Sequence, residues 1–157
     1  MLHVTVIAVG KLKEKFWSQA CDEYLKRLGP YASVEVRELP DIDPSKAGGE
    51  RKAVQQESQA ILSALPEGAL TCLLDIDGKL ATSEGLSELL DECSLSGRSR
   101  VCFVIGGSCG VSEEMRKAAD RRISFGRITL PHNLARVVLL EQIYRAFKIS
   151  RNEPYHK

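Results

Sequence analysis

One stretch that could do chemistry is a glycine-rich run, Gly106-Gly107-Ser108-Cys109-Gly110, which follows the apolar residues Val101 to Ile105. Glycines in a turn after a buried strand let backbone N–H groups approach a ligand closely, as at phosphate sites. The run matches neither G-x-G-x-x-G nor the P-loop pattern, so it gives little support to nucleotide binding of those kinds. Contact with a ligand and a plain tight turn therefore both stay open.

A second stretch is Ile128-Thr129-Leu130-Pro131-His132-Asn133, which joins a short apolar strand to the longest apolar helical pattern in the chain. Pro131 cannot extend a strand ladder, and Asn133 can cap the following helix. We therefore expect the chain to pass from sheet to helix within about four residues. Such turns lie at the carboxyl edge of a parallel sheet, where open α/β folds bind ligands. His132 could be a cap or a ligand contact.

Basic side chains follow this turn along the last helix. Arg136, Arg145, Lys148 and Arg151 could hold phosphate groups, although a solvated helix face is the alternative. Glu141 stands four residues before Arg145 and could form a purely structural ion pair with it. The formal net charge is only +1, but residues 1–112 carry −4 and residues 113–157 carry +5. The basic part of the chain thus contains the candidate site.

The five cysteines are odd in number, show no C-x-x-C spacing and lie mostly in apolar segments, which indicates reduced thiols in a cytoplasmic protein. Cys109 precedes a helix whose positive end could favour a nucleophilic thiolate, but it could equally be a small residue filling a turn. The three histidines lack metal-ligand spacing, so no metal is expected. No basic leader precedes Val4, and no apolar run approaches about 18 residues, so we expect neither secretion nor a membrane span.

Hydrophobic periodicity and turn residues predict five strands that alternate with helices. The predicted strands are 2–9, 33–39, 69–75, 101–105 and 123–130, and the predicted helices are 14–28, 50–65, 82–95, 112–119 and 134–149. Residues 40–49 read as a flexible loop. This order predicts an α/β fold in a single domain, 1–157, with a mainly parallel five- to six-stranded sheet and helices on both faces. Its edge strand would be 33–39, and the apolar strand 101–105 would be central.

The last helix is apolar over more than the single stripe that a surface helix needs. Its apolar positions include Val137, Val138, Leu139, Leu140, Ile143, Tyr144 and Phe147. One face would pack on the sheet and another on a second copy of the chain, so the pattern predicts a homodimer. The tail from Glu153 to Lys157 is too short to pack by itself, yet Pro154 and an aromatic residue suggest that it docks somewhere.

Several motifs in order resemble one family. They are V-I-A-V-G-K near the start, V-I-G-G-S-x-G at 104–110, I-T-L-P-H at 128–132, R-V-V-L-x-E-Q-x-Y-R-A at 136–146 and P-Y-H-K at the end. This set resembles the ribosomal RNA large-subunit methyltransferase H family, within the SPOUT or α/β-knot methyltransferases, over essentially the whole chain. The residues between the glycines, Ser108 and Cys109, depart from many relatives.

The resemblance implies a deep C-terminal trefoil knot, S-adenosylmethionine as methyl donor, and a homodimer. It also implies methylation of N3 of a pseudouridine in 23S rRNA on the assembled ribosome. The family's cofactor contacts match Leu74, Gly106, Phe125, Gly126, Arg127, Ile128, Thr129 and Leu130. Its catalytic residues match Arg145, Tyr155 and His156, on a tail thought to reach the partner subunit's site.

The chemistry of methyl transfer suggests roles for these side chains. The N3–H group must lose a proton, for which His156 is the candidate acceptor, while Tyr155 could stack on or orient the base. Arg136 or Arg145 could hold phosphate or stabilise the deprotonated base. A near-neutral chain would bind arbitrary RNA weakly, so a shaped target is expected. Two other functions stay open: a non-catalytic nucleotide- or RNA-binding module and a thiol enzyme centred on Cys109.

Overall fold

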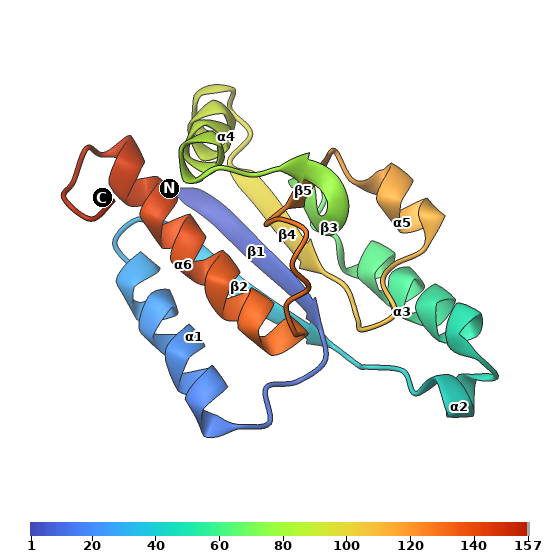
Figure 1. Cartoon of the computed structure of the whole chain (residues 1–157). Coiled ribbons are helices and arrows are strands. Elements are labelled where there is room, and N and C mark those ends of the chain that lie inside the picture. Colours follow the sequence, from blue (N-terminus) through green and yellow to red (C-terminus); the bar gives the residue numbers. More distant parts are fainter. Residues whose placement is uncertain (157) are drawn as a thin grey trace.

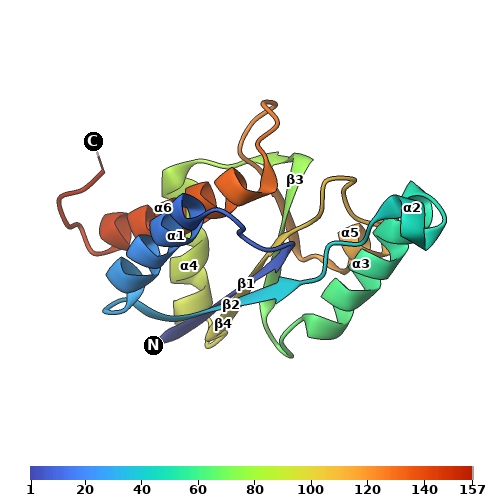
Figure 2. The same cartoon turned by 90° about the horizontal axis from the view of Figure 1, so that it is seen from below.

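The computed structural model describes residues 1–156 and shows a sheet with helices on both sides (Figures 1 and 2). The strands are β1 (Leu2–Val9), β2 (Ala32–Leu39), β3 (Leu70–Leu80), β4 (Arg100–Ile105) and β5 (Arg121–Ser124). The helices are α1 (Lys15–Leu28), α2 (Pro44–Ala47), α3 (Glu50–Ala64), α4 (Ser83–Leu95), α5 (Glu113–Ala118) and α6 (His132–Ser150).

The five strands form one sheet in the order β2-β1-β4-β3-β5, and all four strand pairs are parallel. This confirms the predicted parallel sheet, with β2 at an edge and the apolar strand β4 in the centre. Parallel strands end at the same edge, so the segments after β1, β3, β4 and β5 come together there. The deep trefoil knot stays a prediction.

Alternate side chains of the central strands pack into two separate hydrophobic clusters, one on each face of the sheet. Val4, Val6 and Ala8 of β1 face the cluster that α1, α4 and α6 cover. Ile7 and Val9 face the cluster that α3 and α5 cover. Because both faces are buried, residues 6–9 of β1 and 101–105 of β4 read as continuous apolar runs rather than alternating ones. The prediction of helices on both faces is confirmed, as Figure 2 shows from below.

Two strand boundaries differ from the prediction. β5 ends at Ser124 and not at residue 130, because the Ser124 hydroxyl bonds both the N–H and the carbonyl of Gly126, whose φ is +120°. β3 runs on to Leu80, because its register shifts after Leu74 and it pairs with β5 again at Lys79. β3 and β5 lie so close there that a Cβ on Gly78 would come 2.7 Å from the backbone of Arg122.

Three local expectations were also wrong. Asn133 does not cap α6: the helix begins at His132 after Pro131, and within residues 1–156 the Asn133 side chain accepts a hydrogen bond only from the N–H of Leu134. The expected loop 40–49 contains the one-turn helix α2, capped by the Asp43 carboxylate. The helical spacing of Phe16, Ala20, Tyr24 and Leu28 predicts one packed face on α1, but Phe16 is 61% exposed.

Candidate active site

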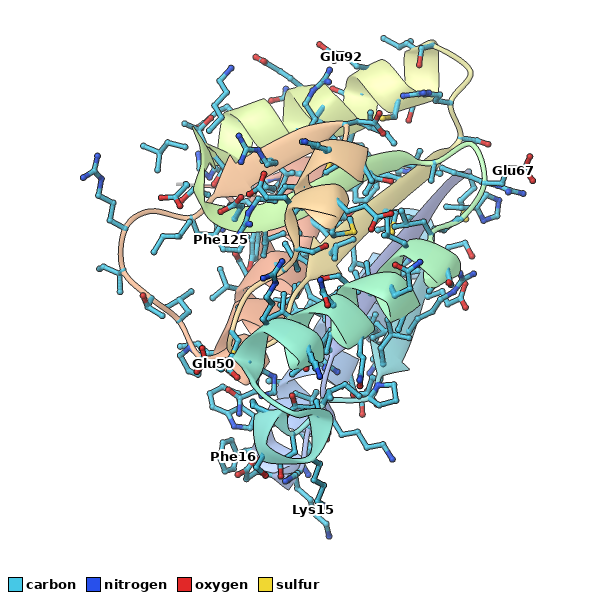
Figure 3. The ribbon with its side chains drawn as sticks, turned by 90° about the vertical axis from the view of Figure 1, so that its right-hand side faces the viewer. Lys15, Phe16, Glu50, Glu67, Glu92 and Phe125 are labelled. Atoms are coloured by element: carbon cyan, nitrogen blue, oxygen red, sulfur yellow. The ribbon has the colours of Figure 1, made fainter. Side chains whose placement is uncertain are left out.

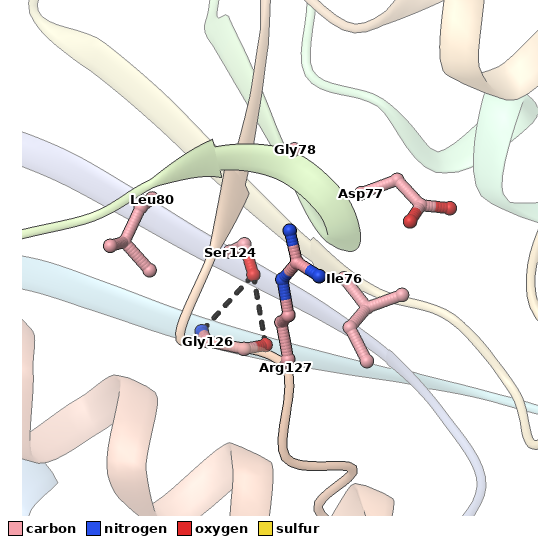
Figure 4. A pocket seen from close by; sticks show the side chains of 7 residues that line it. All are labelled: Ile76, Asp77, Gly78, Leu80, Ser124, Gly126 and Arg127. Carbon is pink, nitrogen blue, oxygen red and sulfur yellow. Dashed lines mark hydrogen bonds between the residues drawn. The ribbon is translucent and has the colours of Figure 1, made fainter.

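A cavity of about 530 Å³ lies at the carboxyl edge of the sheet, between the ends of β3, β4 and β5 and the start of α6. Seven of the eight predicted cofactor residues line it: Leu74, Gly106, Phe125, Gly126, Ile128, Thr129 and Leu130. The eighth, Arg127, lines a neighbouring cleft with Ile76, Asp77 and Gly78 (Figure 4). Three turns far apart in sequence therefore meet at one place. That these residues contact a cofactor stays a prediction.

Neighbouring side chains pack tightly against the glycine turn, residues 106–110. A Cβ on Gly106 would come 2.6 Å from the Val111 side chain, and one on Gly107 would come 2.5 Å from the Glu57 carboxylate. Any larger residue at either position would displace these neighbours. The sequence alone did not separate a ligand turn from a plain tight turn, and the cavity places this one at a ligand-sized space.

Glu57 is a buried carboxylate that sequence reasoning missed. It is 4% exposed and accepts a hydrogen bond of 2.9 Å from the N–H of Ile42. It thus joins the segment after β2 to the glycine turn after β4. Burial raises the pKa of this carboxyl, and the nearby Asp41 carboxyl raises it further. In sequence it reads only as a polar position on a helix, so no local signal would have found it.

His132 lies where α6 meets the cavity. It is among the cavity-lining residues, and its Nδ1 atom is buried without a hydrogen-bond partner within residues 1–156. The ring lies against Gly10, where a Cβ would come 3.2 Å from Cε1 of His132. Of the two predicted roles, cap and ligand contact, the structure excludes the first, because Pro131 is the N-cap residue, α6 begins at His132 itself, and Nδ1 of His132 bonds no backbone N–H within residues 1–156.

The prediction that Arg136 holds phosphate is wrong. The side chain is 3% exposed, and it donates to the Glu38 carboxylate at 2.5 Å and to the Gly10 carbonyl at 3.0 Å. A buried guanidinium with these partners cannot reach RNA. It ties α6 to the ends of β1 and β2, which fixes the start of α6 beside the cavity.

Asp75, at the end of the first segment of β3, is a second carboxylate that sequence reasoning did not single out. Its side chain is 8% exposed and lies 3.5 Å from Arg116 and 3.4 Å from Arg122. Asp75 and Arg116 both line the cavity. The available signal was the position of an acidic residue directly after an apolar strand. The two arginines come from α5 and β5, which the sequence does not place beside it.

The three predicted catalytic residues form a second cluster at the far end of α6. Arg145 lies 4.7 Å over the ring of Tyr155 and 3.2 Å from Nδ1 of His156. Its guanidinium is bound by Glu141 at 2.6 and 2.9 Å, so the expected helical ion pair is present. The Tyr155 hydroxyl also reaches Glu141, at 3.2 Å. Burial and then the Glu141 charge raise the pKa of Tyr155, which keeps its hydroxyl protonated at neutral pH.

The two clusters lie at opposite ends of α6 (Figure 1). His132 and Arg145 are 13 residues apart in the helix, which corresponds to about 20 Å along its axis. Tyr155 and His156 dock beside Arg145, so within one copy they do not reach the cavity. Residue 157, the last of the P-Y-H-K motif, lies outside the described residues.

The thiols and possible metal ligands add no second site. Cys109 is exposed, and its sulfur lies 3.9 Å from the Ser108 hydroxyl. The Cys109 sulfur makes no hydrogen bond with a histidine within residues 1–156. Over the same residues, no group of three His, Cys, Asp or Glu side chains is placed to hold a metal. No helix of the described chain has the length and apolar character that crossing a membrane requires.

The sequence profile of a family described as predicted SPOUT methyltransferases matches residues 2–156. This chain belongs to the SPOUT methyltransferase family. Similar proteins named ribosomal RNA large subunit methyltransferase H come from Pelotomaculum thermopropionicum, 48% identical over 99% of both chains, and Listeria monocytogenes, 49% identical over 99% of this chain and 100% of the relative. A third, named ribosomal RNA large subunit methyltransferase H 1, from Clostridium perfringens, is 46% identical over the same shares.

SPOUT methyltransferases use S-adenosylmethionine, and the cavity fits such a group. Its volume lies within the usual range for small-molecule sites, and its lining combines apolar side chains with glycine backbone. The Nδ1 atom of His132, buried without a partner within residues 1–156, is a polar group that a ligand could satisfy. Leu74, Gly106 and the 125–130 segment would hold the cofactor, which supplies an electrophilic methyl group when bound.

Proposed function

We propose that this SPOUT methyltransferase methylates N3 of a pseudouridine in 23S rRNA, at position 1915, as a cytoplasmic homodimer that acts on the assembled ribosome. The single observation that carries the proposal is the cavity at the carboxyl edge of the sheet, where seven of the eight residues matched from the family's cofactor contacts come together. The names of the relatives support rRNA as the substrate.

The residues of this chain have separate tasks in this reaction. The cavity residues fix the position of the methyl donor, and holding two reactants in line supplies a large part of the rate. When bound, the methyl donor would supply an electrophilic methyl group to N3, with its sulfur as the leaving group, and the N3 proton would leave to a side chain of the protein. His156 is the proposed acceptor of this proton. Tyr155, with its hydroxyl neutral, orients the pseudouridine base.

Arg145 is the proposed stabiliser of negative charge on the deprotonated base. Its hydrogen bonds to Glu141 raise its pKa further, so the guanidinium stays charged at any pH of interest. A fixed cation stabilises developing negative charge most strongly where water is excluded. The aromatic contacts of Tyr155 with Tyr144 and Arg145 keep the three side chains together.

The separation of the two clusters supports a dimer with shared sites. The tail residues lie roughly 20 Å along α6 from the cavity of their own copy. A two-fold axis that runs α6 of one copy against α6 of the other would bring each tail to the partner's cavity. The partly buried residues Val137 and Tyr144 give α6 apolar surface for such a contact.

Two rival functions predict different behaviour. A non-catalytic binding module would bind S-adenosylmethionine or RNA but would transfer no methyl group. A thiol enzyme would lose activity when Cys109 is alkylated or replaced by serine. Neither rival uses the tail, so deletion of residues 154–157 discriminates: loss of methyl transfer with cofactor binding retained supports the proposal.

The decisive experiment is a calorimetric titration with S-adenosylmethionine, followed by transfer of labelled methyl to ribosomes that lack the modification. Gly106→Val should abolish binding, since even its Cβ would clash with Val111. Gly68→Val is the control for lost stability alone: its φ of +74° makes valine strained there, but a Cβ meets nothing within 4 Å and the residue does not line the cavity, so cofactor binding should be kept. Wild-type protein that binds the cofactor yet never methylates ribosomes would leave the binding-module function in its place.

A further inference from the structure

We propose that the segment from Lys11 to Trp17 binds the rRNA substrate, with its lysines at phosphates and Phe16 stacked on an unpaired base. This rests on the proposed rRNA methyltransferase function and assigns the substrate a place on the chain. The segment connects the end of β1 to the first turn of α1.

The segment begins directly beside the cavity. Gly10, the residue before it, lies beside His132, which lines the cavity: a Cβ on Gly10 would come 3.2 Å from Cε1 of His132. The Gly10 carbonyl accepts a hydrogen bond from Arg136. Its N–H donates to the Leu39 carbonyl at 2.8 Å, so the chain leaves the sheet at a fixed point. Figure 1 shows the connection that leaves the end of β1 near the start of α6 and runs to α1.

The residue types suit single-stranded nucleic acid. Lys11, Lys13 and Lys15 are all exposed, and Glu14 is the single acidic residue between positions 11 and 17. Phe16 is 61% exposed although it is large and apolar, and its ring lies 5.0 Å from that of Trp17. Figure 3 shows Lys15 and Phe16 at the outer edge of the molecule. Lysines around exposed aromatic rings are the usual means of holding phosphates and stacked bases.

The same surface fits a second copy of the chain less well. In a two-fold contact the same patch lies on both subunits, so the lysines of one copy would meet those of the other. Like charges in close contact disfavour such an interface. An anionic polymer has the complementary charge, and within the proposed function that polymer is rRNA.

The test measures methyl transfer to unmodified ribosomes at several concentrations of monovalent salt. The variant Lys11→Ala/Lys13→Ala/Lys15→Ala should raise the KM for ribosomes and lower the slope of log KM against log salt by about 2, since each phosphate contact on a single strand contributes about 0.7. Phe16→Ala should raise the same KM roughly tenfold without changing the slope, as expected for lost stacking. In both variants kcat and the Kd for S-adenosylmethionine should match wild type.

The matched control is Lys26→Ala/Lys52→Ala/Arg98→Ala, which removes the same charge at exposed positions elsewhere. Equal KM and slope changes in the two triple variants would overturn the assignment, because the effect would then be one of net charge. A wild-type KM and slope in the lysine variant, or its dissociation to monomers in sedimentation, would overturn it as well. If wild-type protein itself methylates no ribosomes, the proposed function fails, which is a separate result.

Discussion

Arg145 and His156 determine each other's hydrogen bonding. A guanidinium has no acceptor, so at 3.2 Å Arg145 donates to Nδ1 of His156. The proton of the neutral imidazole is therefore on Nε2, which donates to the Glu84 carboxylate at 2.8 Å. In this arrangement the tail is docked with both ring nitrogens occupied. His156 can accept a proton from substrate only after it leaves one of these partners, which agrees with a tail that acts at another copy's cavity.

Mixed dimers test whether the site is shared. Gly106→Val disables the cavity and His156→Ala disables the tail, so each variant alone should be nearly inactive. If the tail acts at the partner's cavity, half of the dimers in an equal mixture are mixed, and one of their two sites has both parts intact. Methyl transfer should then recover to about a quarter of the wild-type rate. A mixture as inactive as its components would show that cavity and tail work within one copy, or that His156→Ala subunits cannot exchange.

Subunit exchange needs its own measurement in that experiment. The two variants should be unfolded and refolded together and the mixed dimer purified by two different affinity tags. If the purified mixed dimer is inactive, the shared-site proposal is wrong. If His156→Ala alone keeps the wild-type rate, the histidine is not the proton acceptor and the mixture is uninformative about the tail, so Arg145→Ala should replace it as the tail variant.

Gly10 should be needed for both stability and cofactor binding. Its φ is +102°, and a Cβ would press on His132 at 3.2 Å. Gly10→Ala should lower the free energy of unfolding by about 1–3 kcal/mol from backbone strain and should also weaken S-adenosylmethionine binding. Gly68→Ala is the matched control, with φ +74° and no atom within 4 Å, and should cost stability alone. Urea unfolding and calorimetry measure the two effects, and equal cofactor affinity in both variants would contradict the role of His132.

Cys109 should be dispensable for methyl transfer. Its exposed thiol lies 3.9 Å from the Ser108 hydroxyl and is not among the residues that line the cavity. Cys109→Ser should keep the wild-type rate within about twofold, because serine fills nearly the same space. The other four cysteines are buried, and burial raises the pKa of Cys72 and of Cys102 to about 12, so alkylation at neutral pH should modify Cys109 alone. A Cys109→Ser protein without activity would support the thiol enzyme.

The sequence predicted the sheet well because its strands are apolar, short and bounded by turn residues. Residues 6–9 of β1 and 101–105 of β4 are buried on both faces, and such short unbroken apolar runs indicate buried strands. The predicted strand 123–130 was too long for a physical reason. Ile128, Thr129 and Leu130 have the composition of a strand, but they follow Gly126, where the backbone turns out of the sheet, and Ile128 is 83% exposed.

Part of the candidate site could likewise be predicted from the sequence, and part of it could not. The glycine turn and the segment before Pro131 were predictable because their residue types are unusual at a strand end. The partners of Arg136 were not, since Glu38 is 98 positions away and its contact depends on how α6 lies across β1 and β2. An arginine on a helix reads as solvent-exposed until tertiary packing buries it. Residues such as Glu57 and Asp75 needed the fold for the same reason.

Glu57 should make the protein less stable as pH rises. Burial raises its pKa above the ordinary 4.5, so the folded chain holds this proton more tightly than the unfolded chain does. The free energy of unfolding should therefore fall as pH increases from about 4.5 through the folded pKa. Glu57→Gln should remove this part of the decrease, because a neutral amide still accepts the Ile42 N–H and can donate to Asp41. Glu57→Ala should lower the free energy of unfolding by about 1–3 kcal/mol at the acidic end of this range, since it leaves the Ile42 N–H unpaired. The difference from wild type should shrink as pH rises, because the variant has no carboxyl to ionise.

Urea unfolding measures this difference. It compares wild type, Glu57→Gln and the exposed control Glu67→Gln at steps of about one unit from about pH 5 to about pH 8. The control should keep the wild-type dependence on pH, because Glu67 has solvent around its carboxylate. Since Glu57 also supports Gly107, Glu57→Ala should weaken S-adenosylmethionine binding while Glu57→Gln restores it. Parallel pH curves for wild type and Glu57→Gln would mean that the carboxylate finds enough solvent or hydrogen bonding to ionise freely, and that the glycine turn is held by packing on Val111 alone.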